Sequence, residues 1–318
     1  MYEQLLSLDH LRLNFNADGL FILNITLGVI MFGVALGIKF ENFKGLFTKP
    51  RVILIGFVAQ FLLLPMLTFL FLILFKSYIT TGVALGMILV AACPGGNISN
   101  FISSLAKGNV ELSVSLTALA TLSAVVLTPF NFAFWGGLYM KVTSQVGENG
   151  LLRPLEIDTK EMFISVFILL GIPLILGMLF SWKFPQITKK IMKPIQTISI
   201  LIFMTFVVVA FAKNYDYFVQ YIQWVMIIVL VHNALALATG YSFASLFKVD
   251  RRSRRTITIE TGIQNSGLAL VLLFNPKIFP PELPLGGMIF IAAWWGIWHM
   301  ISGISLATFF TRFSPDKI

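Results

Sequence analysis

The stretch Pro94-Gly95-Gly96-Asn97-Ile98-Ser99-Asn100 lies inside an otherwise apolar part of the chain, and a second polar stretch runs from Glu260 to Gly267. Proline removes a backbone donor and glycine tolerates non-helical backbone, so a helix should stop near Cys93 and restart near Asn97. An unpaired backbone group at membrane depth costs several kcal/mol, so irregular backbone is tolerated there only when protein buries it or it lines a cavity. Two related interruptions therefore indicate a transport site.

The composition indicates a polytopic membrane protein. Hydrophobic residues make up 57% of the 318 residues and charged residues only 12%, which argues against an ordinary soluble domain. At about 20 apolar residues per crossing, we expect an all-α fold with about nine transmembrane helices. The expected segments are approximately 20–38, 52–75, 81–105, 110–138, 162–182, 195–212, 220–247, 256–275 and 284–311.

The first residues are too polar to supply a further crossing. They lack the cationic start and apolar run of a cleaved signal peptide. We expect residues 1–18 to be an extracytoplasmic or interfacial segment, and residues 19–318 to be a single transporter unit. Five leucines in the first segment could form a short interfacial helix: Leu5, Leu6, Leu8, Leu11 and Leu13.

The distribution of basic residues predicts an orientation. Nine crossings place the two termini on opposite sides of the membrane. If the loop after the first segment is cytoplasmic, that side holds 16 of the 23 Lys and Arg residues and the other side holds seven. The positive-inside rule then predicts an external N-terminus and a cytoplasmic C-terminus in the plasma membrane, the inner membrane of a bacterium. Basic clusters such as 251–255 then act as orientation determinants and contacts with anionic lipid, rather than as a nucleic-acid surface.

The two interrupted segments are the third and the eighth. Their odd separation makes them run in opposite directions through the membrane, as in an inverted repeat. A restarted helix presents free amides and the positive end of a dipole, which favour an anion. The stopped half presents free carbonyls, which favour a cation. If the breaks cross, these groups share one cavity near the middle of the membrane.

Oxygen atoms of several kinds gather around the two breaks. Glu260 falls well inside a segment, and a carboxylate at that depth by default marks a functional site. Ser113, Thr117 and Thr121 share one face of the fourth segment. Alone, such hydroxyls more often bond to their own helix. Together with Asn100 and Glu260, they could complete an oxygen cage for a small hard cation.

Other polar residues in apolar segments have two open interpretations. Gln60 is either a further cation ligand or an interhelical hydrogen-bonding residue. His232 and His299 are more typical of hydrogen-bonded structural residues, although a proton relay is the alternative. The single Cys93 excludes an internal disulfide.

Three stretches, Pro94–Asn100, Lys107–Ser113 and Thr258–Gly267, resemble the bile acid:sodium symporter family in its bacterial form. Supporting matches are Ala59–Phe61, Val231–Asn233 and Trp298–Gly303. The resemblance covers nearly the whole chain from about residue 20, and the combined motifs are highly specific. It implies a core domain with two crossing broken helices and a panel domain that moves relative to it. The panel helices would be approximately 20–38, 162–182 and 195–212, and the core helices 52–138 and 220–311.

The resemblance also implies two co-transported sodium ions, an organic anion and no organic cofactor. One sodium site would use Ser99, Asn100, Ser113, Thr117 and Glu260. The second would use Gln60, Glu260 and Gln264, with main-chain carbonyls at Thr261 and Ile263. The anion would meet Asn97, Ile98, Asn265, Ser266 and His299 at the crossing.

Two departures from the family pattern limit what can be transferred. Many bacterial members have ten helices, whereas this chain lacks a candidate for the first panel helix. Residue 300 is Met where similar bacterial sequences can have Asn. Substrate contacts on the panel side therefore do not transfer from the family pattern.

The leading hypothesis is a sodium-coupled symporter that imports an organic anion, such as a bile acid or a small carboxylate, by alternating access as a monomer. One alternative couples transport to protons carried by Glu260. Another is arsenite efflux, since a related architecture uses a cysteine near the first break, as Cys93 lies here. An intramembrane enzyme is not expected, because the chain has no paired aspartates and no zinc-protease or Gly-x-Ser-x-Gly motif.

Overall fold

Helices make up the fold in the part of the chain that the structure describes. The computed structural model describes residues 1–11, 17–38, 49–96, 98–144, 159–213, 215–275, 277–280 and 283–313. In the first half the helices are α1 (Tyr2–Asp9), α2 (Ala17–Leu36), α4 (Pro50–Val58), η2 (Ala59–Leu63), α5 (Leu64–Leu74), α6 (Thr81–Ala92), α7 (Ile98–Leu105) and α8 (Val110–Ser144). In the second half they are α9 (Thr159–Val166), η3 (Phe167–Gly171), α10 (Ile172–Lys183), α11 (Pro185–Lys213), α12 (Tyr215–Leu246), α13 (Arg251–Gly262), α14 (Ser266–Leu273) and α15 (Gly286–Phe313).

The predicted segments fall on helices in the described part of the chain, so the all-α prediction is confirmed, and the segments 81–105 and 256–275 each consist of two shorter helices. The largest difference concerns α11, which begins at Pro185 rather than near residue 195. Its first turns carry Lys189, Lys190 and Lys193. Lysine is a good helix former but is not apolar, so a hydropathy pattern detects only the apolar remainder of this helix.

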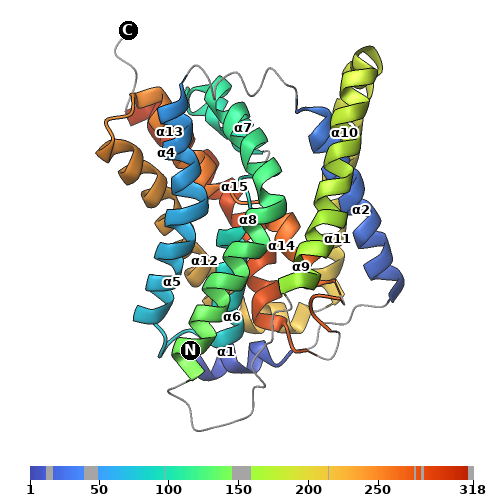
Figure 1. Cartoon of the computed structure of the whole chain (residues 1–318). Coiled ribbons are helices and arrows are strands. Elements are labelled where there is room, and N and C mark those ends of the chain that lie inside the picture. Colours follow the sequence, from blue (N-terminus) through green and yellow to red (C-terminus); the bar gives the residue numbers. More distant parts are fainter. Residues whose placement is uncertain are drawn as a thin grey trace.

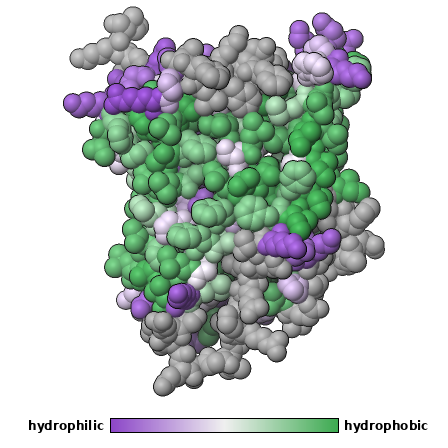
Figure 2. Space-filling view, viewed as in Figure 1, coloured by the Kyte–Doolittle hydropathy of each residue, from purple (hydrophilic) through white to green (hydrophobic). Residues whose placement is uncertain are grey.

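The described residues contain five helices that are long and apolar enough to cross a membrane, in the ranges Pro50–Leu74, Val110–Thr143, Lys160–Lys183, Val219–Leu246 and Gly286–Arg312. The apolar helix α6 is shorter. Figure 2 shows apolar side chains across the middle of one face, with hydrophilic groups along its upper edge and in smaller groups lower on the same face. This distribution is consistent with a multi-pass membrane protein.

Helix α2 packs against α10 and α11, and Figure 1 shows these three helices at the right of the view. The approach of α2 to α10 is close, since a Cβ on Gly177 would lie 2.5 Å from that of Ala35. Ser181 Oγ adds a hydrogen bond of 3.2 Å to the carbonyl of Leu36. Helices α4 to α8 and α12 to α15 pack mainly with one another.

The main hydrophobic cluster is built around α6, α14 and α15. Every residue of α6 from Val83 to Ala92 is buried. The two sides of the first break therefore differ in burial, because the end of α6 before the break is fully buried whereas α7 after it has an exposed Phe101. An enclosed helix end must find partners for its last carbonyls within the protein.

Helix 50–74 is interrupted by the π-helical turn η2, which carries Gln60. Pro65 has no N–H, so it leaves the carbonyl of Phe61, four residues earlier, without its usual helical donor. Asn131 on α8 supplies the missing donor, with Nδ2 3.0 Å from that carbonyl oxygen. The π-turn and its partner thus set the direction in which Gln60 leaves the helix.

The N-terminal segment contains the expected short helix. Leu5 and Leu8 of α1 are fully buried, and α1 contacts α6, α12 and α15. Leu11 packs partly buried against the same cluster. Leu13 lies outside the described residues.

Candidate functional site

The two broken helices meet at their breaks. α6 ends at Ala92, where Cys93 turns to an extended conformation before Pro94, and α13 ends at Gly262. The N–H of Gly96 donates to the carbonyl of Ile263 at 2.7 Å, and the N–H of Asn265 donates to the carbonyl of Pro94 at 2.8 Å. These reciprocal bonds form an antiparallel bridge between Gly95 and Gln264. Each break thus satisfies backbone groups of the other.

The halves of the two broken helices match in length. α6 and α13 each have 12 residues, and α7 and α14 each have eight. At the start of α14, the Asn265 side chain caps the helix by accepting the N–H of Leu268 at 3.0 Å. Helix α7 begins at Ile98, and Ser99 N–H bonds to the Gly96 carbonyl at 2.9 Å. Asn97 lies outside the described residues.

Hydroxyl groups surround the Glu260 carboxylate, which is only 5% exposed. Ser99 donates to Glu260 Oε1 at 2.7 Å, and Thr117 Oγ1 lies 3.2 and 3.1 Å from the two carboxylate oxygens. Ser113 also donates to Oε1. Thr117 contacts Asn100 Oδ1 at 3.3 Å. The structure therefore brings the five residues of the first predicted ion site together.

Gly95 gives the backbone of the first break close access to this carboxylate. A Cβ at this position would lie 3.0 Å from Glu260 Oε2 and 3.3 Å from the Glu260 carbonyl. Thr121, the third hydroxyl of the stripe, donates to the carbonyl of Thr117 at 2.7 Å. It therefore bonds to its own helix and not to the carboxylate.

The residues of the second predicted ion site also lie together. Gln60 Nε2 donates to Gln264 Oε1 at 2.8 Å and to the Cys93 carbonyl at 3.0 Å. Gln264 Nε2 donates in turn to the Thr261 carbonyl at 2.6 Å. The Gln60 Oε1 atom is buried and has no hydrogen-bond partner among the described residues. A buried oxygen acceptor without a donor is a group that a cation or a water could satisfy.

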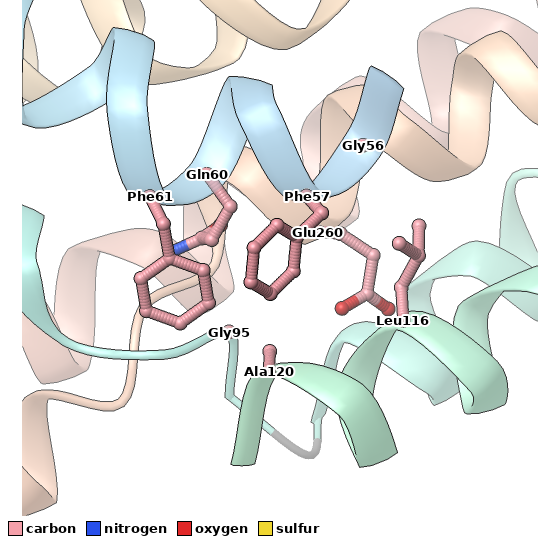
Figure 3. Close-up of a pocket in the computed structure, with 8 residues that line it drawn as sticks. All are labelled: Gly56, Phe57, Gln60, Phe61, Gly95, Leu116, Ala120 and Glu260. Atoms are coloured by element: carbon pink, nitrogen blue, oxygen red, sulfur yellow. The ribbon is translucent and has the colours of Figure 1, made fainter. Parts of the chain in front are cut away.

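A cavity of about 10 Å³ joins the two sets, large enough for about one water-sized group. Glu260, Gln60 and Gly95 line it together with aromatic and aliphatic side chains. Figure 3 shows the rings of Phe57 and Phe61 facing Ala120 and Gly95, with the Glu260 carboxylate beside them. The cavity is therefore lined both by polar oxygens and by apolar side chains.

The structure does not bring the predicted substrate-binding residues together as it does the predicted ion ligands. Ile98 and Asn265 stand at the starts of α7 and α14. Ser266 is buried against α15, where a Cβ on Gly296 would lie 2.8 Å from its hydroxyl. His299 on α15 is buried, with no partner for Nδ1 among the described residues. No contact described here joins Ile98, Asn265, Ser266 and His299 into one group.

Sequence reasoning missed several polar residues near the breaks. Ser103 is fully buried and lies 3.2 Å from Ser113 Oγ. Asn233 donates to the Gly262 carbonyl at 2.8 Å. Its neighbour His232 contacts Thr68 Oγ1 at 2.9 Å and the Trp295 ring at 4.8 Å, so the structural interpretation of this histidine fits its contacts. The feature of the sequence that could have identified Asn233 is its polar amide side chain inside an apolar helix.

Residues 24–221 match the sodium bile acid symporter family. The chain belongs to the sodium bile acid symporter family. It is accordingly a membrane transporter and not an enzyme. The bile acid:sodium symporter resemblance inferred from the two breaks is therefore confirmed.

The names of individual relatives also refer to sodium-dependent transport or to sodium cotransport. The "uncharacterized sodium-dependent transporter YocS" of Bacillus subtilis (strain 168) is 31% identical over 290 residues, which span 91% of this chain and 83% of that protein. The "probable sodium/metabolite cotransporter BASS2, chloroplastic" of Oryza sativa subsp. japonica is 31% identical over 284 residues, 86% of this chain and 64% of that protein. "Sodium/bile acid cotransporter 4" of Homo sapiens is 28% identical over 271 residues, 84% of this chain and 59% of that protein.

Proposed function

We propose that this protein is a secondary active transporter that carries two sodium ions and an organic anion, such as a bile acid or a small carboxylate, into the cell. The observation that carries the proposal is the cluster in which Ser99, Ser113 and Thr117 surround the Glu260 carboxylate beneath the paired breaks. Hard cations prefer such oxygen ligands. The names of the relatives describe those proteins as sodium-dependent or sodium-coupled.

The first sodium ion would bind among Ser99, Asn100, Ser113, Thr117 and Glu260. The second would bind among Gln60, Glu260, Gln264 and the carbonyls of Thr261 and Ile263. The unpartnered Oε1 of Gln60 and the small cavity that it shares with Glu260 support this second assignment. Because Glu260 belongs to both sets, one ion would stabilise the ligand geometry for the other.

The anion would bind where the helices restart. The N-termini of α7 and α14 lie at the crossing, so the positive ends of their helix dipoles are directed toward it. Asn97, Ile98, Asn265, Ser266 and His299 are the residues proposed to contact it. The carboxylate or sulfonate class follows from this chemistry, and the two relatives named for their cargo are described with metabolites or bile acid.

Transport would proceed by movement of a panel domain, α2, α9 to α11, against a core domain, α4 to α8 and α12 to α15. The two core halves are proposed to form an inverted repeat, which the matched lengths of the broken helices and their reciprocal bonds support. Both ion sets lie within one chain, so we propose a functional monomer. Two sodium ions with a monoanion would move one net charge, which gains about 2.3 kcal/mol per 100 mV.

The test is the thermal stability of the purified protein in sodium chloride against choline chloride at equal ionic strength and fixed pH. Sodium at about 100 times its dissociation constant should stabilise the fold by about 2.7 kcal/mol. Glu260→Gln should abolish this response. Glu111→Gln is the matched control, because Glu111 is an exposed carboxylate at the start of α8 and should leave the response intact.

Transport itself is tested by measuring anion uptake. Proteoliposomes with the wild-type protein should accumulate an anion from a metabolite panel only with an inward sodium gradient, and with inward positive current. A response that follows pH but not sodium would replace sodium coupling with proton coupling. Absence of any sodium effect on stability and uptake would refute the proposal.

A further inference from the structure

Three successive carbonyls at the end of α13 are held by three different donors. The Thr261 carbonyl accepts from Gln264 Nε2 at 2.6 Å, and the Ile263 carbonyl accepts from Gly96 N–H at 2.7 Å. Between them, the Gly262 carbonyl accepts from Asn233 Nδ2 at 2.8 Å. The outer two donors belong to the breaks themselves, whereas Asn233 belongs to α12. The last carbonyls of a helix have no helical partner, so these donors decide where each one points.

The amide of Asn233 has a fixed orientation. Its Oδ1 accepts from the hydroxyl of Ser302 on α15 at 2.5 Å. A carbonyl can only accept, so the amide nitrogen of Asn233 must face Gly262 and its oxygen must face Ser302. Asn233 is 1% exposed, so both of its hydrogen bonds lie in the protein interior. The chain of bonds therefore runs from Ser302 through Asn233 to Gly262.

The helix that carries Asn233 is held firmly on both sides. One residue earlier, His232 bonds Thr68 on α5 and packs against Trp295 on α15. Two glycines let α12 and α13 approach closely, because a Cβ on Gly240 would lie 2.8 Å from the Ile257 carbonyl and one on Gly262 would overlap Leu237. These contacts on both sides of α12 fix the position of Asn233.

We propose that Asn233 and Ser302 are positioning residues for ion coupling, which hold the Gly262 carbonyl toward α12 and so direct the backbone that carries the second ion site. The Gly262 carbonyl and the Ile263 N–H share one peptide plane. Holding that plane sets the direction in which Ile263 and Gln264 leave α13. The inference rests on the proposed function, since the site it supports is the proposed second sodium site.

A role confined to helix stability makes a different prediction. It lowers the thermal stability at every sodium concentration and leaves the sodium dependence unchanged. A positioning role changes the sodium concentration that gives half of the maximal stabilisation. The two roles are therefore separated by a sodium titration of the melting temperature, with the sodium-free melting temperature as its baseline.

The experiment compares Ser302→Ala and Asn233→Leu with the wild type. Ser302→Ala frees the Asn233 amide to rotate, and it should raise the half-effective sodium concentration about five- to tenfold, as expected for loss of one buried hydrogen bond. Asn233→Leu keeps a similar volume, carries no charge and cannot donate to Gly262, so its shift should be at least as large. Ser302→Thr keeps the hydroxyl and should restore the wild-type value. If Asn233→Leu fails to fold, the Ser302 pair decides the result.

Thr239→Val is the matched control on α12. Thr239 is also buried, but the one side-chain hydrogen bond that its hydroxyl makes to the described residues goes to the Leu235 carbonyl of its own helix, at 2.7 Å. This variant should titrate like the wild type. Wild-type sodium dependence in Ser302→Ala would overturn the positioning role while leaving the proposed function intact. Absence of a sodium response in the wild type itself would refute both.

Discussion

At the scale of single residues, Asp9 connects the N-terminal helix to two core helices. Its Oδ2 accepts the N–H of Gly82 in the first turn of α6 at 2.8 Å. The same carboxylate packs against Gly287 in the first turn of α15, where a Cβ would overlap Oδ1. Asp9 is 6% exposed. A single carboxylate thus lies at the positive ends of two helix dipoles.

The burial of Asp9 predicts a pH-dependent stability. Burial raises the pKa of Asp9 from 3.8 to about 6, and the N–H groups of Gly82 and Val83 oppose this shift only in part. The folded state therefore binds the proton more tightly than the unfolded state. The contribution of Asp9 is fully present below pH 4 and is lost as the pH rises through about 6. It amounts to at most about 3 kcal/mol, because one pKa unit corresponds to about 1.4 kcal/mol.

The measurement is the melting temperature of wild type and Asp9→Asn between pH 4 and 7.5 at constant sodium. The asparagine oxygen can still accept from Gly82, but the side chain does not titrate. Wild type should therefore gain stability relative to Asp9→Asn as the pH falls. His10→Gln removes the neighbouring titratable group and should keep the wild-type trend. Parallel curves for wild type and Asp9→Asn would show that Asp9 does not titrate in this range.

The polar residues near the breaks could be predicted from the sequence, because placing a polar group inside a membrane costs free energy. Glu260 and the hydroxyls of Ser99, Ser113 and Thr117 were expected as one group, and the structure places these side chains in contact. Their role as sodium ligands stays a prediction. The hydrogen bond between Asn233 and Ser302 was not predicted, because neither residue stands beside a break in the sequence as Ser99 and Glu260 do. Hydropathy shows that such a residue is polar but not which partner it meets.

At the scale of elements, apolar length predicted the helices but not their internal irregularities. The range 52–75 indicated one crossing, and the structure has a helix over 50–74. Pro65 signals a distortion in that helix. The sequence does not reveal that the distortion is a π-turn at Ala59–Leu63, since its stabilising partner Asn131 lies on α8.

The π-turn predicts a measurable coupling between Pro65 and Asn131. Asn131→Leu leaves the buried Phe61 carbonyl without a donor, so it should lower the free energy of unfolding by about 1 to 3 kcal/mol. Pro65→Ala supplies a backbone N–H four residues after Phe61, which can satisfy this carbonyl within the helix. The double variant should therefore be more stable than the sum of the two single changes predicts, by about 0.5 to 3 kcal/mol.

This coupling is measured by denaturing the wild type, the two single variants and the double variant in sodium-free buffer. Strict additivity would show that Asn131 does not replace the donor that Pro65 lacks. The sodium titration adds a second readout. Restoring a regular helix turns Gln60 away from Gln264, so the double variant should be stable yet respond more weakly to sodium than wild type.

At the scale of the whole molecule, the charged residues divide between the two ends of the helix bundle. The start of α11, which carries three lysines, and the basic start of α13 lie at the upper end in Figure 1, whereas α1 lies at the lower end. Lys76, in the connection between α5 and α6, lies at the end of the bundle that carries α1. The excess of basic residues on the α11 and α13 side predicts that this end is cytoplasmic.

Cysteine labelling tests this orientation, and the chain suits the method because its single cysteine, Cys93, is fully buried. Lys76 and Lys190 are both exposed, so each can be replaced by cysteine in turn. A membrane-impermeant maleimide should label Lys76→Cys in intact cells and Lys190→Cys only after lysis. The wild-type protein, which keeps Cys93, should stay unlabelled in both conditions. Labelling of Lys190→Cys in intact cells, with Lys76→Cys protected, would invert the predicted orientation and place the N-terminal helix in the cytoplasm.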